Sequence, residues 1–588
     1  MISSLNDIFL NLKNYKIKIK KMCCNSKAVD VIENDDKSKP IESNPTKSSK
    51  KSKESESSNN EYDLDVKNST NNKINANSDK FSGFDKKKLL LNAENAEKEE
   101  KYDDAIDIYN YLMNKNKKDI NNYFNLGKIY MKLGLYEKAL DIYNKGIKYS
   151  NNKDALYLNK GICLFNLERY EEAVETYDQG LNIDQKDHNL FLNKGVALNQ
   201  LKKYEEAVAS FKSGILLKSN DPSLYNNLGV SYFRLKEYEQ SILYLDEAIK
   251  LKPEDHLQYI NKGISLKGLQ KYDEALEQFN KALEINPKEP ICFYNIAITY
   301  KAKREYEKSL KYFDKAIELN KKYLSAYYHK GITLNNMGRE EEAIECFNKC
   351  LDLNPYYDFA YLNKGIAYDI IGKKQEALES YNKALELNPK FAEAYLNKGI
   401  TLYNKGNYEE ALESYNKAIE CNEKFATAYN NKGVCLFRLK RYDEAIEAYD
   451  KAINIDPRYI DAYINKGVCL REMGKLDEAD EQFRKALELK PNHYLAYFHL
   501  GVIYSKKDKK YNKAMEYFDL AIQYRPDHYE SHFYKGLLEM KMGLYGDAIQ
   551  SFLKCREIKK NKDEECEKKI KECTIAVNNI LNQQYKNN

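Results

Sequence analysis

The sequence predicts an all-α protein built as a solenoid, and two observations support that prediction. A small residue in a similar sequence context recurs every 34 residues over most of the 588-residue chain. A fixed period of this size is typical of repeat architectures, in which each unit packs against its neighbours. In addition, Ala, Leu, Glu and Lys are common whereas Gly and Pro are scarce, and this composition favours helices.

The repeat is best followed by the last residue of an Asn-Lys-Gly motif, which we number position 8 of each unit. The spacing is 34 residues at every step except the last, which is 35. The spacing predicts about fourteen units over residues 86–562. Position 8 is occupied by Ala93, Gly127, Gly161, Gly195, Gly229, Gly263, Ala297, Gly331, Gly365, Gly399, Gly433, Gly467, Gly501 and Gly536.

Each unit has the pattern of two helices joined by a turn. Position 20 is Ala in twelve units, with Ser241 and Ser309 as near equivalents. Small residues at positions 8 and 20 would let two helix backbones approach closely. Position 24 carries a ring or Leu in many units and position 27 is often small, which gives an apolar stripe at helical spacing. Position 32 is Pro in seven units, where it would end the second helix.

This pattern resembles the tetratricopeptide repeat family across roughly residues 86–562. Two features depart from the family pattern. Its Trp at position 4 is absent and is usually replaced by Tyr or Phe, and its Leu at position 7 is often Lys, as at Lys160. The resemblance implies a right-handed superhelical α-solenoid of helix-turn-helix repeats, whose first helices line a concave groove.

The two ends of the chain differ from the repeats. Residues 1–85 are polar and poor in large apolar side chains, so we expect them to be mostly disordered. Within them, residues 2–24 combine an apolar helical stripe, a run of lysines and adjacent Cys23 and Cys24. These features would suit an acylated membrane tether, although an unstructured leader is the simpler interpretation. Residues 563–588 predict a polar helix with an apolar stripe that caps the array.

Position 6 is the feature that packing explains least. Asn is a poor helix former because its side chain competes for backbone hydrogen bonds, yet it fills this position in ten units, and His fills it in two. The family's architecture turns position 6 toward the groove, where an amide can pair with a peptide C=O and N–H together. The twelve residues are Asn125, Asn159, Asn193, Asn227, Asn261, Asn295, His329, Asn363, Asn397, Asn431, Asn465 and His499.

These amides predict a ladder that holds extended peptides with little regard to their sequence. The array also looks similar to that of the O-linked N-acetylglucosamine transferases, and this resemblance implies the same use of Asn at position 6. No catalytic domain accompanies the array here. A general enrichment of Asn in this chain is the competing explanation, because position 25 is Asn in six units.

No motif for catalysis is evident outside the repeats, so we expect neither an enzyme, a cofactor, a metal nor a small-molecule substrate. His528 and His532 have a metal-like spacing but lack further ligands nearby. The net charge of +5 gives no case for nucleic-acid binding. Twelve scattered cysteines favour free thiols and a cytoplasmic location. The sequence therefore predicts a scaffold for proteins or peptides in extended conformation.

Two alternative functions stay open at the level of sequence. One is a non-catalytic targeting or regulatory subunit of an enzyme on another chain, for example a glycosyltransferase. The other is a co-chaperone. The family's chaperone clamp needs Lys at position 5 and Asn at position 9, and neither residue is found there.

Overall fold

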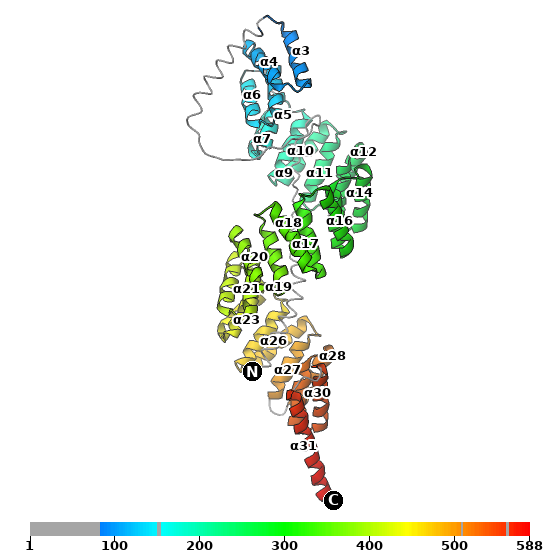
Figure 1. Cartoon of the computed structure of the whole chain (residues 1–588), viewed down its shortest axis with the longest axis vertical. Coiled ribbons are helices and arrows are strands. Elements are labelled where there is room, and N and C mark those ends of the chain that lie inside the picture. Colours follow the sequence, from blue (N-terminus) through cyan, green and yellow to red (C-terminus); the bar gives the residue numbers. More distant parts are fainter. Residues whose placement is uncertain (1–80, 82, 150–153, 507–509, 560–563, 588) are drawn as a thin grey trace. The chain divides into compact units, whose positions relative to one another are not determined.

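The computed structural model describes residues 81, 83–149, 154–506, 510–559 and 564–587, and all regular structure in these ranges is helical (Figure 1). The all-α prediction and the tandem helix pairs are therefore confirmed. The proposed tether, with Cys23 and Cys24, and nearly all of the expected disordered tail lie outside the described residues. No described helix is both long and apolar enough to cross a bilayer.

The described chain divides into two compact units, with the boundary between Tyr323 and Leu324. The N-terminal unit contains seven helix pairs, each made of an odd-numbered and the following even-numbered helix. They are α3 (Lys86–Lys98), α4 (Tyr102–Lys115), α5 (Ile120–Lys132), α6 (Tyr136–Tyr149), α7 (Asp154–Asn166), α8 (Tyr170–Leu181), α9 (His188–Gln200), α10 (Tyr204–Leu217), α11 (Pro222–Arg234), α12 (Tyr238–Leu251), α13 (His256–Gly268), α14 (Tyr272–Ile285), α15 (Pro290–Ala302) and α16 (Tyr306–Leu319).

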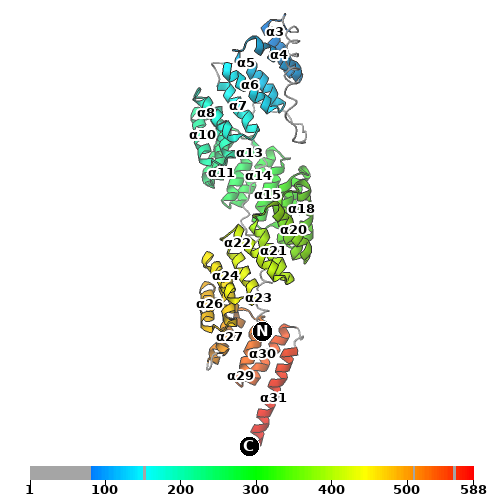
Figure 2. The same ribbon diagram turned by 90° about the vertical axis from the view of Figure 1, so that its left-hand side faces the viewer.

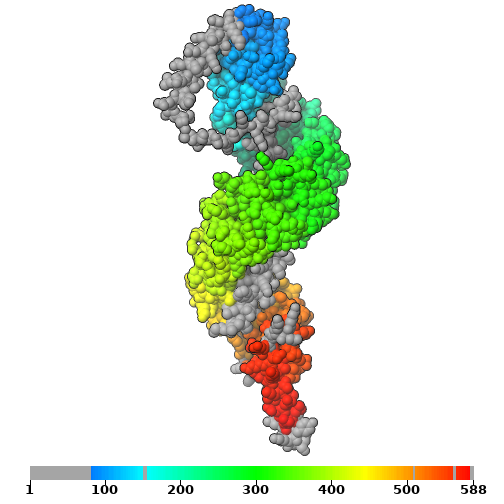
Figure 3. Space-filling model, in the orientation of Figure 1, coloured from blue at the N-terminus to red at the C-terminus, as the bar shows by residue number. Residues whose placement is uncertain are grey.

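The C-terminal unit contains seven further pairs and a final single helix. Figures 2 and 3 show this last helix, α31, at the end of the unit. The helices are α17 (Leu324–Met337), α18 (Glu340–Leu353), α19 (Asp358–Ile370), α20 (Lys374–Leu387), α21 (Ala392–Lys405), α22 (Tyr408–Cys421), α23 (Ala426–Arg438), α24 (Tyr442–Ile455), α25 (Ile460–Glu472), α26 (Leu476–Leu489), α27 (Tyr494–Lys506), α28 (Tyr511–Tyr524), α29 (Tyr529–Lys541), α30 (Tyr545–Ile558) and α31 (Glu564–Asn587).

The glycine at position 8 makes room for the ring at position 24 of the same repeat. A Cβ atom added at Gly195 would lie 2.5 Å from the Phe211 ring, and one at Gly433 would lie 2.5 Å from the Tyr449 ring. Both rings are almost fully buried. The two helices of a pair are thus closed by a contact within one 34-residue unit, because the ring fills the space that a side chain at position 8 would take.

Serine at position 20 has a local explanation. Ser241 is fully buried and donates to the carbonyl of Gly229 at 2.7 Å, and Ser309 donates to the carbonyl of Ala297 at 2.8 Å. Each hydroxyl therefore bonds to the backbone of position 8 on the facing helix. A buried hydroxyl without a partner would be costly, and this contact removes that cost.

Candidate functional site

Position 6 lies in the first helix of each pair, within its second turn. All twelve side chains at this position are half-buried or buried, and none is exposed. First helices of neighbouring repeats contact each other within each unit, for example α7 with α9 and α21 with α23. The side chains at position 6 therefore follow one another along a row of first helices.

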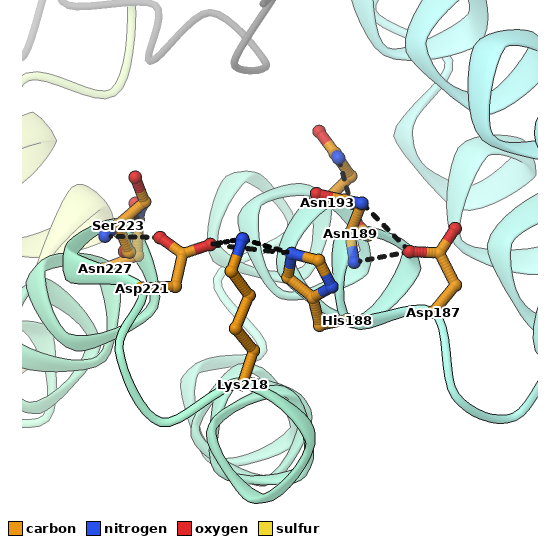
Figure 4. Close-up of polar contacts among 8 residues, drawn as sticks. All are labelled: Asp187, His188, Asn189, Asn193, Lys218, Asp221, Ser223 and Asn227. Carbon is orange, nitrogen blue, oxygen red and sulfur yellow. Dashed lines mark hydrogen bonds and ion pairs between the residues drawn. The ribbon is translucent and has the colours of Figure 1, made fainter.

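Six of the asparagines donate a hydrogen bond to their own helix. In each case Nδ2 lies 2.8 or 2.9 Å from the carbonyl oxygen four residues earlier, at position 2. Figure 4 shows this contact for Asn193 and Asn227. The bond fixes the amide and uses one of its two N–H groups. Oδ1 therefore remains for another partner, and so does the second N–H except at Asn363, where it is also engaged. The six are Asn159, Asn193, Asn227, Asn295, Asn363 and Asn397.

Position 6 also reaches back to position 5 of the preceding repeat. Nδ2 of Asn261 donates to Oδ1 of Asn226 at 3.0 Å, and Nδ2 of Asn465 donates to Oδ1 of Asn430 at the same distance. In a third repeat, Nδ2 of Asn363 also contacts the hydroxyl of Tyr328 at 3.2 Å. No role was predicted for position 5, although two repeats have consecutive Asn residues at positions 5 and 6.

The amides of repeats 11 and 12 form a connected chain. Asn465 donates to Asn430, and Nδ2 of Asn430 donates to Oδ1 of Asn431 at 3.4 Å. Nδ2 of Asn431 is buried and has no hydrogen-bond partner among the described residues. An unsatisfied buried donor typically costs about 1–3 kcal/mol. The end of this amide chain is thus a donor that an added acceptor would stabilise.

The two histidines at position 6 differ from the amides. His499 is 1% exposed, stacks on Phe483 and has Nδ1 2.9 Å from a guanidinium nitrogen of Arg471. Burial, and the neighbouring Arg471, lower the pKa of His499 well below its usual value, so its ring stays neutral and accepts from the arginine. His329 packs edge-on against Tyr328. We infer that His499 holds Arg471 in place rather than extending the ladder.

A polar cluster of His188, Lys218 and Asp221 lies near two of the position-6 amides, Asn193 and Asn227 (Figure 4). Nε2 of His188 lies 3.2 Å from Nζ of Lys218 and 3.7 Å from a carboxylate oxygen of Asp221. The other oxygen of Asp221 accepts from the backbone N–H of Ser223 at 2.9 Å, at the start of α11. These contacts orient the start of α11, the helix that carries Asn227. The described part of the chain contains no group of three or more His, Cys, Asp or Glu side chains able to hold a metal.

Comparison with family models identifies the repeat. Models described as tetratricopeptide repeat match residues 222–255, 257–289, 290–323, 325–357, 359–391, 390–458, 424–492 and 494–528, and a model described as TPR repeat matches residues 195–236. A model of anaphase-promoting complex, cyclosome, subunit 3 matches residues 98–180. No curated protein matches the sequence.

The chain is also similar to several solved structures. A chain of the APC/C hetero-tetramer Cut9–Hcn1 is 18% identical, with 82% of this chain and 96% of that chain covered and a TM-score of 0.42. YrrB, titled a TPR protein with an unusual peptide-binding site, is 27% identical, with 31% and 95% covered and a TM-score of 0.28. MamA is 33% identical, with 27% and 94% covered and a TM-score of 0.26.

The tetratricopeptide models together cover more than half of the chain, in the same register as the observed helix pairs. Members of this family are typically non-catalytic scaffolds for protein interactions. The chain therefore belongs to the tetratricopeptide repeat family.

Proposed function

We propose that this protein is an interaction scaffold that holds extended segments of other proteins through its position-6 amides. The observation that supports the proposal is the fixed orientation of these side chains. Six amides are held by the same bond to position 2, so each keeps Oδ1 in a similar direction from one repeat to the next, and all except Asn363 also keep one N–H. Groups that are already ordered lose little conformational entropy when a ligand binds.

The spacing of the amides suits an extended main chain. Packed helices lie about 8–10 Å apart, and an extended peptide rises about 3.3 Å per residue. One amide is therefore available for roughly every third residue of a bound segment. An amide that pairs with a peptide N–H and C=O does not read the side chains of the guest. Binding should accordingly be broad and depend on extended conformation.

Repeats 9 to 11 allow a compact test, because position 6 is Asn in all three. The triple variant Asn363→Ala/Asn397→Ala/Asn431→Ala removes them, and Asn110→Ala/Asn144→Ala/Asn280→Ala removes as many amides from position 25. Binding is measured on an array of 15-residue peptides of random sequence. We expect wild type and the position-25 variant to bind the same peptides. The position-6 variant should lose at least tenfold in affinity for most of them, since the hydrogen bonds of three amides are lost and each bond contributes about 0.5–1.5 kcal/mol.

A particular outcome would contradict the proposal. If the position-6 variant keeps the same set of bound peptides at the same affinity, the amides are not the binding groups. Hydrogen exchange of α19, α21 and α23 in the full chain serves as the folding control. It separates lost binding from lost structure.

A further inference from the structure

The lysine at position 7 replaces the family's leucine and has a carboxylate partner in at least four of the repeat-to-repeat contacts that the structure describes. Its ammonium group pairs with an Asp at position 25 of the preceding repeat, at 2.5–2.7 Å, and the lysine side chains are only 17–24% exposed. The stem of the lysine is thus buried while its charge meets a carboxylate. The four pairs are Lys194–Asp178, Lys262–Asp246, Lys466–Asp450 and Lys535–Asp519.

Three consecutive junctions of the C-terminal unit lack this carboxylate. Position 25 is Asn there, and the lysines at position 7 are half-buried as in the paired junctions. None of the three lysines forms an ion pair or hydrogen bond with another residue that the structure describes. The ammonium group of Lys364 lies 5.7 Å from the centre of the Tyr368 ring. The junctions are Asn348/Lys364, Asn382/Lys398 and Asn416/Lys432.

For two of the three lysines the electrostatic environment indicates that nearby carboxylates compensate the charge only in part. Burial lowers the pKa of Lys364 and of Lys398, which shows that nearby carboxylates do not offset the loss of water. Those carboxylates are engaged elsewhere. Asp352 pairs with Lys349 at 3.6 Å, Glu413 with Lys417 at 2.7 Å, Glu444 with Arg441 at 2.5 Å, and Glu410 accepts from Asn407 at 2.8 Å.

We propose that Lys364, Lys398 and Lys432 form a binding strip for an acidic, extended segment of a partner protein. The three charges recur once per repeat, about 8–10 Å apart. An extended segment with a carboxylate at every third residue has nearly this spacing, at about 3.3 Å per residue. Each carboxylate would take the place that Asp178, Asp246, Asp450 or Asp519 occupies in the paired junctions.

The strip is separate from the amide ladder. Position 7 reaches the second helix of the preceding repeat, whereas position 6 reaches the first helix. The chemistry also favours an acidic peptide over a nucleic acid. Asp352, Glu410, Glu413 and Glu444 lie close to the lysines and would repel a polyanion as dense as duplex DNA, which carries one charge per about 1.7 Å. A sparse row of carboxylates would avoid them.

The paired junctions supply the design of the test. The triple variant Asn348→Asp/Asn382→Asp/Asn416→Asp gives each free lysine an internal partner, and Asp450→Asn frees Lys466, which extends the strip to four consecutive lysines. The probe is a fluorescein-labelled peptide with glutamate at every third residue among serine and glycine, measured by anisotropy at low ionic strength. Peptides with glutamine in place of glutamate, polyuridylate and phosphatidylserine vesicles are the comparison probes.

We expect the triple variant to bind the glutamate peptide about tenfold more weakly, because three ion pairs of up to about 1 kcal/mol each are replaced by internal ones. Asp450→Asn should tighten binding about two- to fivefold. The position-6 triple variant should keep the same preference for the glutamate peptide over the glutamine peptide as wild type, which keeps the strip distinguishable from the ladder. The triple Asp variant should melt no lower than wild type.

Several results would overturn the proposal. They are equal binding of the glutamine peptide, unchanged binding by the triple Asp variant, no gain for Asp450→Asn, and tighter binding of polyuridylate or vesicles than of the glutamate peptide. A melting temperature below wild type for the triple Asp variant would also contradict it, since the new carboxylates would then not be pairing with the lysines.

Discussion

The N-terminal and C-terminal units repeat the same helix pair but secure the start of its first helix in different ways. At four first helices of the N-terminal unit an Asp at position 34 accepts a hydrogen bond from the backbone N–H two residues later, as at Asp187 and Asp221. Asp85 and Glu289 make no such bond. In the C-terminal unit position 34 is aromatic and makes no such bond, as at Tyr357 and Phe391. Phe391 is instead 5% exposed, with its ring 4.9 Å from that of Phe359.

The backbone nevertheless follows nearly the same path. The φ and ψ angles are −80° and 101° at Asp187, and −89° and 91° at Tyr357. A satisfied N–H and a buried ring are therefore alternative ways to stabilise one conformation. The geometry of the repeat therefore does not depend on one kind of helix cap, because either a hydrogen bond or the burial of an apolar ring stabilises the turn.

The turn between the two helices shows a second difference. Position 15 has a positive φ at every such turn that the structure describes, and a positive φ favours glycine. The C-terminal unit uses glycine at most of these turns, such as Gly372 and Gly406, whereas the N-terminal unit mostly uses other residues, such as Glu168 and Lys202 with φ near 60°. The N-terminal unit thus carries more backbone strain at its turns.

The largest effect should be common to both units. Phe211→Ala in the N-terminal unit and Tyr449→Ala in the C-terminal unit each remove a buried ring from position 24, and we expect each to cost about 3–5 kcal/mol. Hydrogen exchange of the full chain, read separately for the helices around each site, measures the loss. A large effect in one unit and a small one in the other would show that the shared core contact does not stabilise them equally.

Acidification should affect the C-terminal unit more strongly. Burial lowers the pKa of His528 to about 3 and that of His499 well below its usual 6.5. Below pH 6.5 the histidines of the unfolded chain bind protons, whereas the buried histidines of the folded chain do not. The free energy of unfolding therefore falls by about 1.4 kcal/mol per pH unit for each histidine. The histidines of the N-terminal unit, His188 and His256, are only half-buried.

Hydrogen exchange at pH 7 and pH 5 checks this prediction, after correction for the intrinsic exchange rate. We expect α27 to α30 to lose protection at pH 5 relative to α9 to α14. Burial raises the pKa of Glu530 and Glu539, which acts in the opposite direction. That opposing effect sets in at their raised pKa and is complete near pH 4.5. Equal protection at pH 7 and pH 5 of α27, which carries His499 and neither glutamate, would contradict the assignment of His499 as buried and neutral.

The caps provide a smaller effect, confined to the N-terminal unit. Asp187→Ala removes the side chain that accepts from the N–H of Asn189 at 2.8 Å, and should cost about 1 kcal/mol in local stability of α9. Asp187→Asn is the control, because its amide oxygen can still accept the bond. If both variants lose the same stability, the charge of Asp187 and not the cap is the stabilising feature.

The turns should give the smallest effect and with opposite signs. Lys202→Gly relieves a positive φ and should gain up to about 0.5 kcal/mol, because glycine also makes the unfolded chain more flexible. Gly406→Lys introduces the strain into the C-terminal unit and should cost about 1 kcal/mol. Thermal unfolding of the two variants gives the comparison. Equal signs for both changes would show that position 15 is not strained.

The repeat and its core could be predicted from the sequence because they depend on contacts within one 34-residue repeat. Positions 8, 20 and 24 recur with fixed chemistry, so periodicity alone identifies the pair of helices. Contacts between repeats were missed. The ion pair of Lys466 with Asp450 joins neighbouring repeats, and an equivalent pair is found at only some positions of the array. His499 contacts Arg471, which lies 28 residues earlier in the sequence. Nothing in the pattern showed which rotamer the position-6 amides adopt.

The closure of each pair by its own glycine and ring has a consequence for how such a chain changes during evolution. Duplication or deletion of one whole 34-residue unit leaves every remaining glycine beside its own ring, so the array can lengthen or shorten without losing its core. The lysine–aspartate pairs join one repeat to the next and depend on which repeats are neighbours. A change in the order of the repeats would therefore preserve the fold and change which lysines of the surface are paired.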